Sequence, residues 1–374
     1  MQIRIITCHD SYNFGAPLQA TALCEYLCRL GHDAKVIDYV PEDRHDSYRS
    51  RTHTILEWPL LRPIARLIDK YREYRRRDRH RRFASYLSAL PLTRRYTSLR
   101  QLRDNPPQAD LYIAGSDQIW NPRFPDGRDP AFYLNFGPES VHRASYAASF
   151  GSRRLPVDSF YIMQSRLSRL DDISVRESSG LDILSSLGYA GLQTVDPVFL
   201  MPRSYWDSAA DRSEIQPKGK YILIYAFDAG TLITDTARRL SREMHMPVIS
   251  ISPCHMKGAD KNYRNAGPIE FLGLVRGASV VLTESFHAVA FSMIFHVPFY
   301  AFRHRESRNV RITDFLSALG LSRRLITSEA TTIPPVDMDF TSPDAILSDM
   351  REASVEYLGH ITSASSMHIK KTGA

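Results

Sequence analysis

This sequence of 374 residues has few cysteines and no long apolar run. Cys24 and Cys28 are spaced as on one face of a helix, which fits burial better than a redox or zinc pair, so a reducing cytoplasm is the expected compartment. No stretch of about 18 apolar residues is present, which excludes a transmembrane helix. Asp10 and Asn13 stand where a signal peptide would need its apolar segment. With 43% hydrophobic and 24% charged residues, the composition excludes a wholly disordered chain.

The sequence also lacks the short motifs of common cofactor and metal sites. No G-x-G-x-x-G follows the first expected strand, so the fingerprint of a dinucleotide site is missing. No pair of histidines has ligand spacing with a third ligand close by, and no Asp-x-Asp occurs in the loops considered below. We therefore expect no metal ion and no resident cofactor.

Positive charge is concentrated in one segment. The formal net charge is +7, but residues 62–103 hold 14 Lys or Arg against three acids, a net of +11, which leaves −4 for the rest. The segment is either a solvated helix face or a helix lying on an anionic membrane surface, because apolar residues such as Leu61, Ile64 and Leu67 recur beside the arginines. No recognised nucleic-acid module accompanies it, which argues against nucleic acid as a partner.

Strand and helix patterns alternate along the first half of the chain. A β-branched strand at 2–8 precedes a helix that begins at Pro17 and ends before Gly31, and strand 34–39 follows. Such β-α-β units build parallel sheets. Residues 60–90 have the spacing of one long helix or of two. Further strands are predicted at 111–114, 144–149, 172–175 and 192–195.

The alternation restarts with a strand at 221–227, after a stretch rich in proline. Two successive halves of this kind predict an α/β fold of two doubly wound, Rossmann-like domains that face each other across a cleft. The expected divisions are an N-terminal domain at 1–200, a linker at 201–217, a C-terminal domain at 218–342, and a final helix with a patternless tail at 343–374.

Four unusual loops are candidate sites, because ligands of open α/β sheets bind where strands end. The first loop, residues 8–20, holds Asn13, Phe14 and Gly15 directly before the helix that Pro17 opens. Glycine permits close approach of a ligand, and free amides at a helix start attract an anion. The alternative is a tight turn capped by the asparagine.

The second loop, AGSDQIWNP at 114–122, places four functional side chains within five residues. Polar groups beside a tryptophan fit a sugar, because the aromatic face covers the C–H groups of the ring while the polar groups bind its hydroxyls. The alternative is a capped helix start with a core tryptophan. The side chains concerned are those of Ser116, Asp117, Gln118 and Trp120.

The other two loops carry charge. Arg176 ends an internal strand, where it can hold a carboxylate or a phosphate with two parallel hydrogen bonds. The alternative for Arg176 is a structural ion pair with Glu177 or Asp196. In the fourth loop, His287 lies in the first turn of a helix, where its charged form requires an anionic partner; the alternative is an ordinary structural histidine. His296, deeper in the same segment, is predicted to belong to the core.

The order and spacing of these loops resemble the polysaccharide pyruvyl transferase family. The resemblance covers about residues 1–325 and implies a two-domain fold like that of the GT-B glycosyltransferases. It also implies an enzyme that transfers the enolpyruvyl unit of phosphoenolpyruvate to a sugar, gives a pyruvate ketal and releases phosphate. The segments that carry the resemblance are SYNFGAPLQA, GSDQIWNP, YAASFG, SVRESSG, DPVFL and TESFHAVAFSMIFHVPF.

The resemblance also implies residues that bind the donor. His287 matches the family's histidine near the start of a helix in the C-terminal domain. Many members have an arginine two residues earlier, where this chain has Ser285. The missing positive charge would then come from Arg176, which lies in a matched segment, or from Arg303 or Arg308, which follow the strand expected at 298–302.

Ketal formation needs an acid that protonates the enol methylene and a base that takes a proton from the attacking hydroxyl. We expect His287 to be the acid or a clamp for the phosphate, and either Asp117 or Glu284 to be the base. The residues expected to bind the acceptor are Asn13, Phe14, Gly15, Ser116, Gln118 and Trp120.

The expected acceptor is a lipid-linked oligosaccharide at the inner face of the cell membrane, as in the synthesis of capsules and exopolysaccharides. The basic segment 60–82 would hold the enzyme there by peripheral contact. Two alternatives remain open. The chain could be a GT-B glycosyltransferase that uses a nucleotide sugar, or a non-catalytic sugar-binding protein of a polysaccharide assembly complex.

Overall fold

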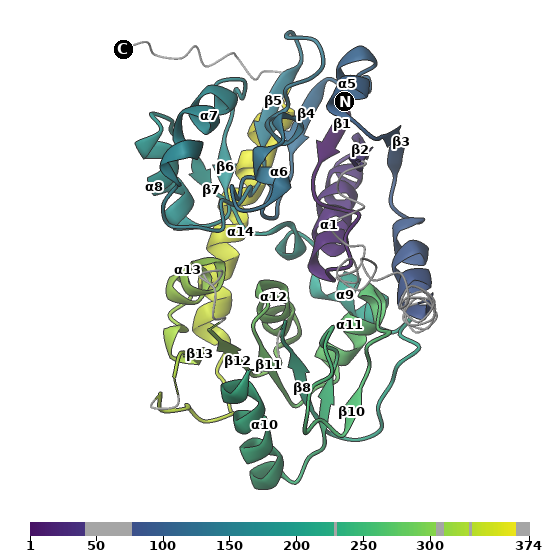
Figure 1. Ribbon diagram of the computed structural model, residues 1–374, viewed down its shortest axis with the longest axis vertical. Helices are drawn as coiled ribbons and strands as arrows, with labels where there is room; N and C mark the ends of the chain where they lie inside the picture. The colour runs from purple at the N-terminus through teal and green to yellow at the C-terminus, as the bar shows by residue number, and fades with distance from the viewer. Residues whose placement is uncertain (42–76, 228–229, 304–309, 329–330, 364–374) are drawn as a thin grey trace, which may run out of the picture.

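Each half of the chain contains one parallel β-sheet, and helices fill the space between the two sheets (Figure 1). The computed structural model describes residues 1–41, 77–227, 230–303, 310–328 and 331–363. The sheet of the first half has the strand order β3-β2-β1-β4-β5. Its strands are β1 (Gln2–Ile6), β2 (Asp33–Tyr39), β3 (Leu92–Tyr96), β4 (Leu111–Ala114) and β5 (His142–Ser145).

The sheet of the second half has the strand order β10-β9-β8-β11-β12-β13. Two short strands, β6 (Ser174–Val175) and β7 (Leu192–Gln193), form a separate parallel pair in the first half. The strands of the second sheet are β8 (Ile222–Tyr225), β9 (Val248–Ser250), β10 (Lys261–Asn262), β11 (Val280–Thr283), β12 (Phe299–Phe302) and β13 (Leu325–Ile326).

Helices connect the strands and cover both sheets. Residues 77–87 are also helical. The other α-helices in the described ranges are α1 (Gly15–Arg29), α5 (Leu99–Asp104), α6 (Pro125–Arg128), α7 (Val157–Leu167), α8 (Ser178–Ser186), α9 (Arg203–Ala210), α10 (Thr231–Met244), α11 (Pro268–Arg276), α12 (Phe286–Phe295), α13 (Val310–Ala318) and α14 (Thr341–Thr362).

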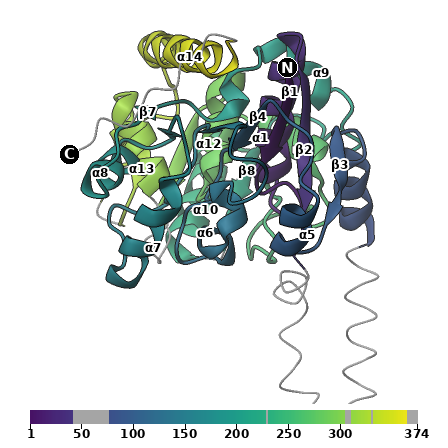
Figure 2. The same cartoon turned by 90° about the horizontal axis from the view of Figure 1, so that it is seen from above.

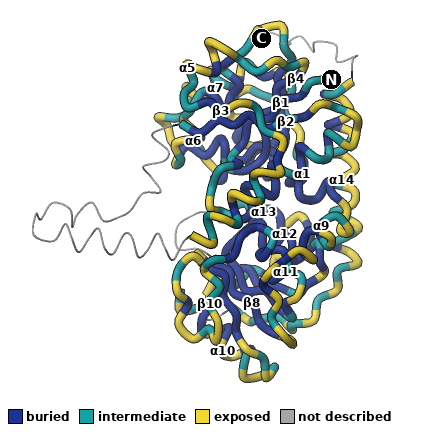
Figure 3. Tube along the Cα trace, turned by 90° about the vertical axis from the view of Figure 1, so that its right-hand side faces the viewer, coloured by how far each residue is buried: buried dark blue, intermediate teal, exposed yellow. Residues whose placement is uncertain are grey.

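The central strands are buried on both faces, as expected for parallel sheets covered by helices. Ile3 and Ile5 of β1 and Ile222 and Leu223 of β8 have no exposed surface. Figure 3 shows that the central strands and α12 lie in the dark interior, whereas exposed residues lie on outer helix turns and in loops. The expected fold of two doubly wound domains is therefore present.

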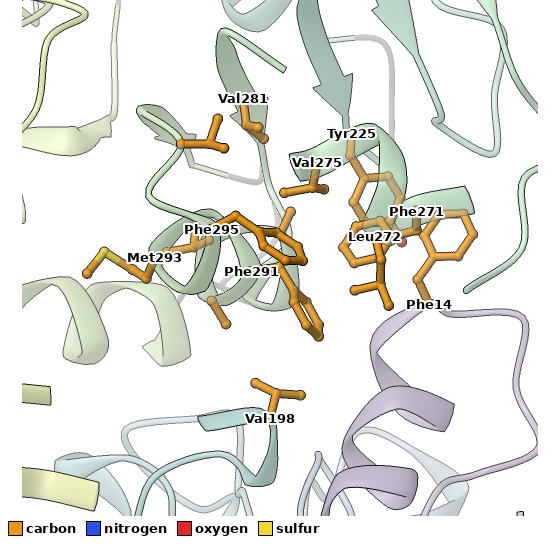
Figure 4. Close-up of a cluster of buried hydrophobic side chains, with 14 of the residues drawn as sticks. Phe14, Val198, Tyr225, Phe271, Leu272, Val275, Val281, Phe291, Met293 and Phe295 are labelled. Carbon is orange, nitrogen blue, oxygen red and sulfur yellow. The ribbon is translucent and has the colours of Figure 1, made fainter. Parts of the chain in front are cut away.

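Helix α12 joins the cores of the two halves. Its residues are mostly apolar, and all of them except Ile294 are buried, including the polar His287 and Ser292. Phe291 packs edge-on against Phe271, and Phe271 stacks on Phe14 from the first half at 5.0 Å between ring centroids. Figure 4 shows Phe14 and Val198 approaching this cluster from the other half. Burial of these aromatic groups stabilises the packing of the two halves against each other.

The segment 201–217 is more than a linker, because it contains α9. Trp206 of this helix is fully buried, and its Nε1 donates a hydrogen bond to the carbonyl of Val198. Arg276 of α11 forms ion pairs with Asp207 and Asp211 at 3.5 and 2.6 Å. The segment therefore belongs to the packed interior between the halves.

Helix α14 spans both halves (Figure 1), and seen from above it lies along one outer side of the molecule (Figure 2). Near its start, Asp344 pairs with His296 at 2.8 Å on the second half. Further along, the hydroxyl of Tyr357 donates to the carbonyl of Ser145 in the first half. The prediction that His296 is a core residue is wrong: it is exposed and ends α12 with a φ of 55°.

The basic segment contains a strand that its helical pattern does not predict. Residues 77–87 are helical, and residues 60–76 lie outside the described part of the chain. The strand β3 follows at 92–96 and pairs with β2 at the edge of the sheet. Arg94 and Arg95 in it are exposed, a composition that protects an edge strand from further pairing. None of the described helices is long and apolar enough to cross a membrane.

Candidate functional site

Three of the four predicted loops lie where the strand order of a sheet reverses. The order turns between β1 and β4 in the first sheet and between β8 and β11 in the second. Ligands of doubly wound sheets bind at such points, beyond the carboxyl ends of the strands. The loops after β1, β4 and β11 come from these positions, and the fourth loop follows β6.

A buried charged cluster lies where these loops meet. Arg176 donates from Nη1 to Oδ2 of Asp196 at 2.5 Å, and Nε2 of His287 lies 3.4 Å from the same oxygen. That separation is an ion-pair distance, and the pair does not have hydrogen-bond geometry. Asp196 thus connects an arginine of the first half with a histidine of the second. All three residues are at least 95% buried.

Three further charges surround Arg176. Glu177 Oε1 lies 3.2 Å from Nε of Arg176 and accepts a hydrogen bond from the hydroxyl of Ser149. Asp117 Oδ1 lies 3.8 Å from Nη2 of Arg176 and 3.6 Å from Nη1 of Arg311 on α13. The cluster therefore combines two arginines and a histidine with three carboxylates.

Burial and charge shift the proton affinities of the cluster in opposite directions. Burial on its own raises the pKa of Asp196, but His287 and Arg176 outweigh it, so this pKa lies well below its usual range. Burial raises the pKa of Glu177 above its usual value, although Arg176 acts against the rise. Burial and the charge of Arg176 lower the pKa of Arg311. Shifts of this kind concentrate at functional sites.

Some of the cationic nitrogens lack hydrogen-bond partners. Nη2 of Arg176, Nε of Arg311 and Nε2 of His287 are buried and have no hydrogen-bond partner within the described ranges. Leaving a buried donor unpaired costs about 1–3 kcal/mol. An anion placed among them would recover that energy, and charge-assisted hydrogen bonds from arginine are among the strongest available.

Gly15 brings the start of α1 against the histidine. A Cβ atom at Gly15 would lie 1.9 Å from Nδ1 of His287, so only glycine fits this contact. The side chain of Asn13 accepts a hydrogen bond from the amide of Gly15, which is the tight turn that the sequence left as an alternative. The loops of the two halves are therefore in direct contact.

Little space remains beside the cluster in this closed arrangement. A cavity of about 10 Å³ adjoins it, and room of that size holds about one water molecule. Its walls include Arg176, Asp196 and Arg311, with Phe286 and Phe315 on the apolar side. The guanidinium carbon of Arg176 lies 4.6 Å from the ring centroid of Phe286. This space is far smaller than pockets that hold small organic ligands, which measure about 300–1,000 Å³.

Several predicted residues belong to this cluster. Arg176 forms both ion pairs that the sequence offered as its structural alternative, and Asp117 and His287 lie close to it. The hydroxyl of Ser116 lies 3.4 Å from Asp196 Oδ2. Asp117 has a φ of 73°, a conformation that costs energy for a residue other than glycine and is concentrated at functional sites.

Other predicted residues lie apart from these contacts. The Oε2 atom of Glu284 accepts a hydrogen bond from the amide of Phe227. Gln118 accepts one from the side chain of Asn121. Ser285 precedes the first residue of α12 without capping it through its side chain. Arg303 is exposed after β12, and Arg308 lies outside the described residues.

Two predicted acceptor contacts are core residues instead. Trp120 has no exposed surface: its ring stacks on Tyr133, and its Nε1 donates to the carbonyl of Phe132. Its face is therefore closed to a sugar ring, and the alternative of a core tryptophan is correct. Phe14 is buried in the stack between the halves, which corrects its expected role in the same way.

Sequence reasoning missed two features of the site. Arg311 gave no signal, because its place beside Asp117 depends on how α13 docks. A row of aromatic rings also runs from Tyr12 through the buried stack to Tyr225 and Phe227, and both ends of it are exposed, at 41% and 39%. The sequence did not reveal this row, because its rings come from segments that are far apart along the chain.

Solved structures with this architecture define its class. A Listeria monocytogenes protein described as a UDP-N-acetylglucosamine 2-epimerase is 10% identical, with a TM-score of 0.53 over 97% of this chain and 96% of its own. The UDP-GlcNAc 2-epimerase from Methanocaldococcus jannaschii, solved with UDP-GlcNAc and UDP, is 12% identical, with a TM-score of 0.51 over 94% of this chain and 100% of its own. The fold is thus of the GT-B type.

A family model narrows this class. The model of the polysaccharide pyruvyl transferases matches residues 13–306, well over half of the chain. The protein therefore belongs to the polysaccharide pyruvyl transferase family. No curated protein sequence matches it.

Proposed function

We propose that this protein transfers the enolpyruvyl unit of phosphoenolpyruvate to a sugar of a polysaccharide precursor, and that the cluster around Arg176 binds the donor. One observation carries the proposal: buried nitrogens of Arg176, Arg311 and His287 belong to one cluster and have no hydrogen-bond partners among the described residues. Phosphoenolpyruvate brings a carboxylate and a phosphate, and these two groups suit arginines best.

The carboxylates of the cluster fit this role as positioning groups. Asp196 and Asp117 hold the guanidinium of Arg176 between them, so its orientation is set before a donor arrives. Glu177 has a raised pKa, which favours its neutral form when a substrate anion enters. A neutral Glu177 repels an incoming anion less than its carboxylate form does.

The residues supply the proton transfers that ketal formation requires. In the proposed reaction, His287 gives a proton to the C3 methylene of the donor, and C2 becomes electrophilic. A sugar hydroxyl forms a bond to C2 and loses its proton to a base, for which Asp117 is the candidate within the cluster. A second hydroxyl of the same sugar then attacks C2. The bond from C2 to the phosphate oxygen breaks with its electron pair, and phosphate takes up the remaining proton as it leaves.

The acceptor is proposed to be a lipid-linked oligosaccharide at the inner membrane surface. The basic residues Arg75 and Arg76, outside the described ranges, and Arg77 would contribute to contact with the membrane. Replacing all three by Ala should weaken binding to vesicles that contain anionic lipid by at least tenfold in a sedimentation assay. Unchanged binding would leave the segment as a solvated face.

Calorimetric titration tests the donor site directly. Phosphoenolpyruvate should bind saturably to the wild-type protein, and binding should be lost in His287→Ala. His296→Ala is the matched control, because this histidine lies at the other end of the same helix, is exposed, and contacts Asp344 and Phe340 near the start of α14. It should bind phosphoenolpyruvate as the wild type does.

The same titration separates the alternatives. Binding of UDP-galactose without phosphoenolpyruvate would indicate a nucleotide-sugar transferase and refute the proposal. Binding of neither would favour a non-catalytic sugar-binding protein. Turnover is the second readout, since His287→Ala should abolish phosphate release in the presence of acceptor while the fold is retained.

A further inference from the structure

A second space between the two halves is separate from the charged cluster. It is a cavity of about 650 Å³, within the size range of pockets for small molecules. Its walls come from α1, from the segment 81–91, and from α9 and α11. Thr21 in its wall lies six residues after Gly15 on α1, a rise of about 9 Å from the contact with His287.

Aromatic rings separate the two spaces. Phe83 stacks on Phe14 at 5.7 Å between centroids, and Phe14 stacks on Phe271 at 5.0 Å. Tyr86, one turn after Phe83, lines the cavity, as does Glu270, the neighbour of Phe271. A ligand in the cavity would therefore lie beside the reacting groups without touching them.

Charge in the cavity is balanced and largely paired. Arg82 bonds to Glu214 at 2.8 Å and lies 3.3 Å from Glu270, while Glu25 pairs with Arg29 at 2.8 Å. The three carboxylates at the wall face the three arginines that also line the cavity, Arg81, Arg82 and Arg212, so the lining carries no net charge. A neutral ligand therefore needs no counter-charge there.

Two hydrogen-bonding groups in the cavity remain unused, one neutral and one charged. The hydroxyl of Tyr205 and the guanidinium of Arg212 line the cavity and have no hydrogen bond or ion pair within the described ranges. The hydroxyl of Tyr86 interacts with that of Thr21, and Thr21 Oγ1 is buried with no partner of good hydrogen-bond geometry among the described residues. Buried polar groups without partners favour a ligand that supplies them.

We infer that this cavity binds a neutral sugar unit of the acceptor glycan, at a distance from the unit that is modified. A hexose binds through its hydroxyls, which can hydrogen-bond to the hydroxyls and the free guanidinium of the cavity. The rings of the two tyrosines can cover its C–H groups. The inference rests on the proposed function only in taking the acceptor to be a glycan. It adds a second contact, which would select the chain that the enzyme modifies.

Saturation-transfer NMR with lactose, cellobiose and maltose at millimolar concentrations tests this site. At least one disaccharide should bind to the wild-type protein. Ala89→Trp, at the exposed rim of the cavity, should weaken that binding at least tenfold. The double variant Tyr86→Phe/Tyr205→Phe keeps both rings, and loss of each hydrogen bond should weaken binding about 3–10-fold.

Two controls fix the location. His287→Ala should leave disaccharide binding unchanged, as should Arg100→Ala on the exposed face of α5. Absence of binding by all three sugars overturns the inference, and so does binding that survives Ala89→Trp or disappears in His287→Ala. Calorimetry with phosphoenolpyruvate on the same preparations tells this failure from a failure of the donor proposal, because Ala89→Trp should leave donor binding intact.

Discussion

The charged cluster around Asp196 and the cavity beside α1 lie between the same two halves, yet they are built in opposite ways. The cluster is dense in ionised groups that compensate one another and leaves room for about one water molecule. The cavity is large, its charges are paired at the wall, and its unused groups are hydroxyls and one guanidinium.

This difference separates two tasks that one cleft can perform. A site that transfers protons and a charged group must hold its ionised side chains in place before the substrate arrives, and close packing does so. A site that recognises a long neutral chain needs space and hydrogen-bonding groups more than charge. If this comparison holds, the cluster is rigid and its ionised groups stabilise one another, and each property can be tested by substitution.

The largest effect is expected at the centre of the cluster. Asp196→Asn removes the carboxylate that faces both Arg176 and His287 and leaves buried positive charge uncompensated, which costs about 3–5 kcal/mol of unfolding free energy. Urea denaturation measures the loss. Asp235→Asn, in an exposed pair with Arg238, should cost less than about 1 kcal/mol. Equal losses in the two variants would show that Asp196 is not the central partner.

The next effect concerns the contact between the loops. Gly15→Ala places a methyl group against His287 and should displace it by about an ångström, which can lower kcat/KM about 100-fold. Gly359→Ala in α14 is the control, since nothing lies within 4 Å of its added methyl group. That variant should be fully active and slightly more stable. Normal activity of Gly15→Ala would show that the tight contact is dispensable.

A smaller effect separates the core from the site. Trp120→Phe should destabilise the protein by about 1–3 kcal/mol, because the carbonyl of Phe132 loses its buried donor. The KM for the acceptor should stay the same, since the face of Trp120 is closed to ligands. Thermal unfolding and steady-state kinetics together check this expectation. A raised KM with unchanged stability would restore the role of Trp120 as a sugar platform.

The smallest effect is the dependence of stability on pH. The folded pKa of Asp196 lies below its ordinary value of 3.8, so the stability it contributes is present above about pH 4 and is lost as pH falls through the folded pKa. Glu177 acts in the opposite sense: its pKa is raised above 4.5, and its contribution is lost as pH rises through that raised value.

Urea denaturation at a series of pH values measures both terms. Each carboxylate changes the unfolding free energy by at most about 1.4 kcal/mol per pH unit. Glu177→Gln should remove the decline that begins above the ordinary glutamate pKa of 4.5, and Asp196→Asn should flatten the decline that begins below the ordinary aspartate pKa of 3.8. An unchanged pH profile in both variants would place the sensitivity elsewhere.

The sequence was sufficient to predict the architecture, because buried parallel strands and their crossover helices leave clear apolar patterns. The sequence did not predict strands that lie at a sheet edge or that have only two residues. The strand at 92–96 lies at the sheet edge with Arg94 and Arg95 exposed, so its pattern resembles the basic helix before it. Strands of two residues, such as 261–262 and 325–326, have too few residues to show any period.

The candidate site was predictable as far as loops at strand ends identify it. Arg176, Asp117 and His287 come from three such loops and meet in space. Arg311 was not predictable, since its contact with Asp117 arises from the docking of α13. Trp120 was predicted to bind a sugar but is buried, because polar neighbours in sequence do not reveal which way an aromatic ring points.

The final helix has a consequence for how the protein is made. Ser354 of α14 accepts a hydrogen bond from the amide of Val195, and Tyr357 bonds to the strand end at Ser145. Leu358 and Ile361 complete the apolar core on the first sheet. The apolar core of the first half, which is synthesised first, is therefore complete only after α14 has been synthesised at the end of the chain. Until then its unfinished apolar surface is open to chaperones and to aggregation.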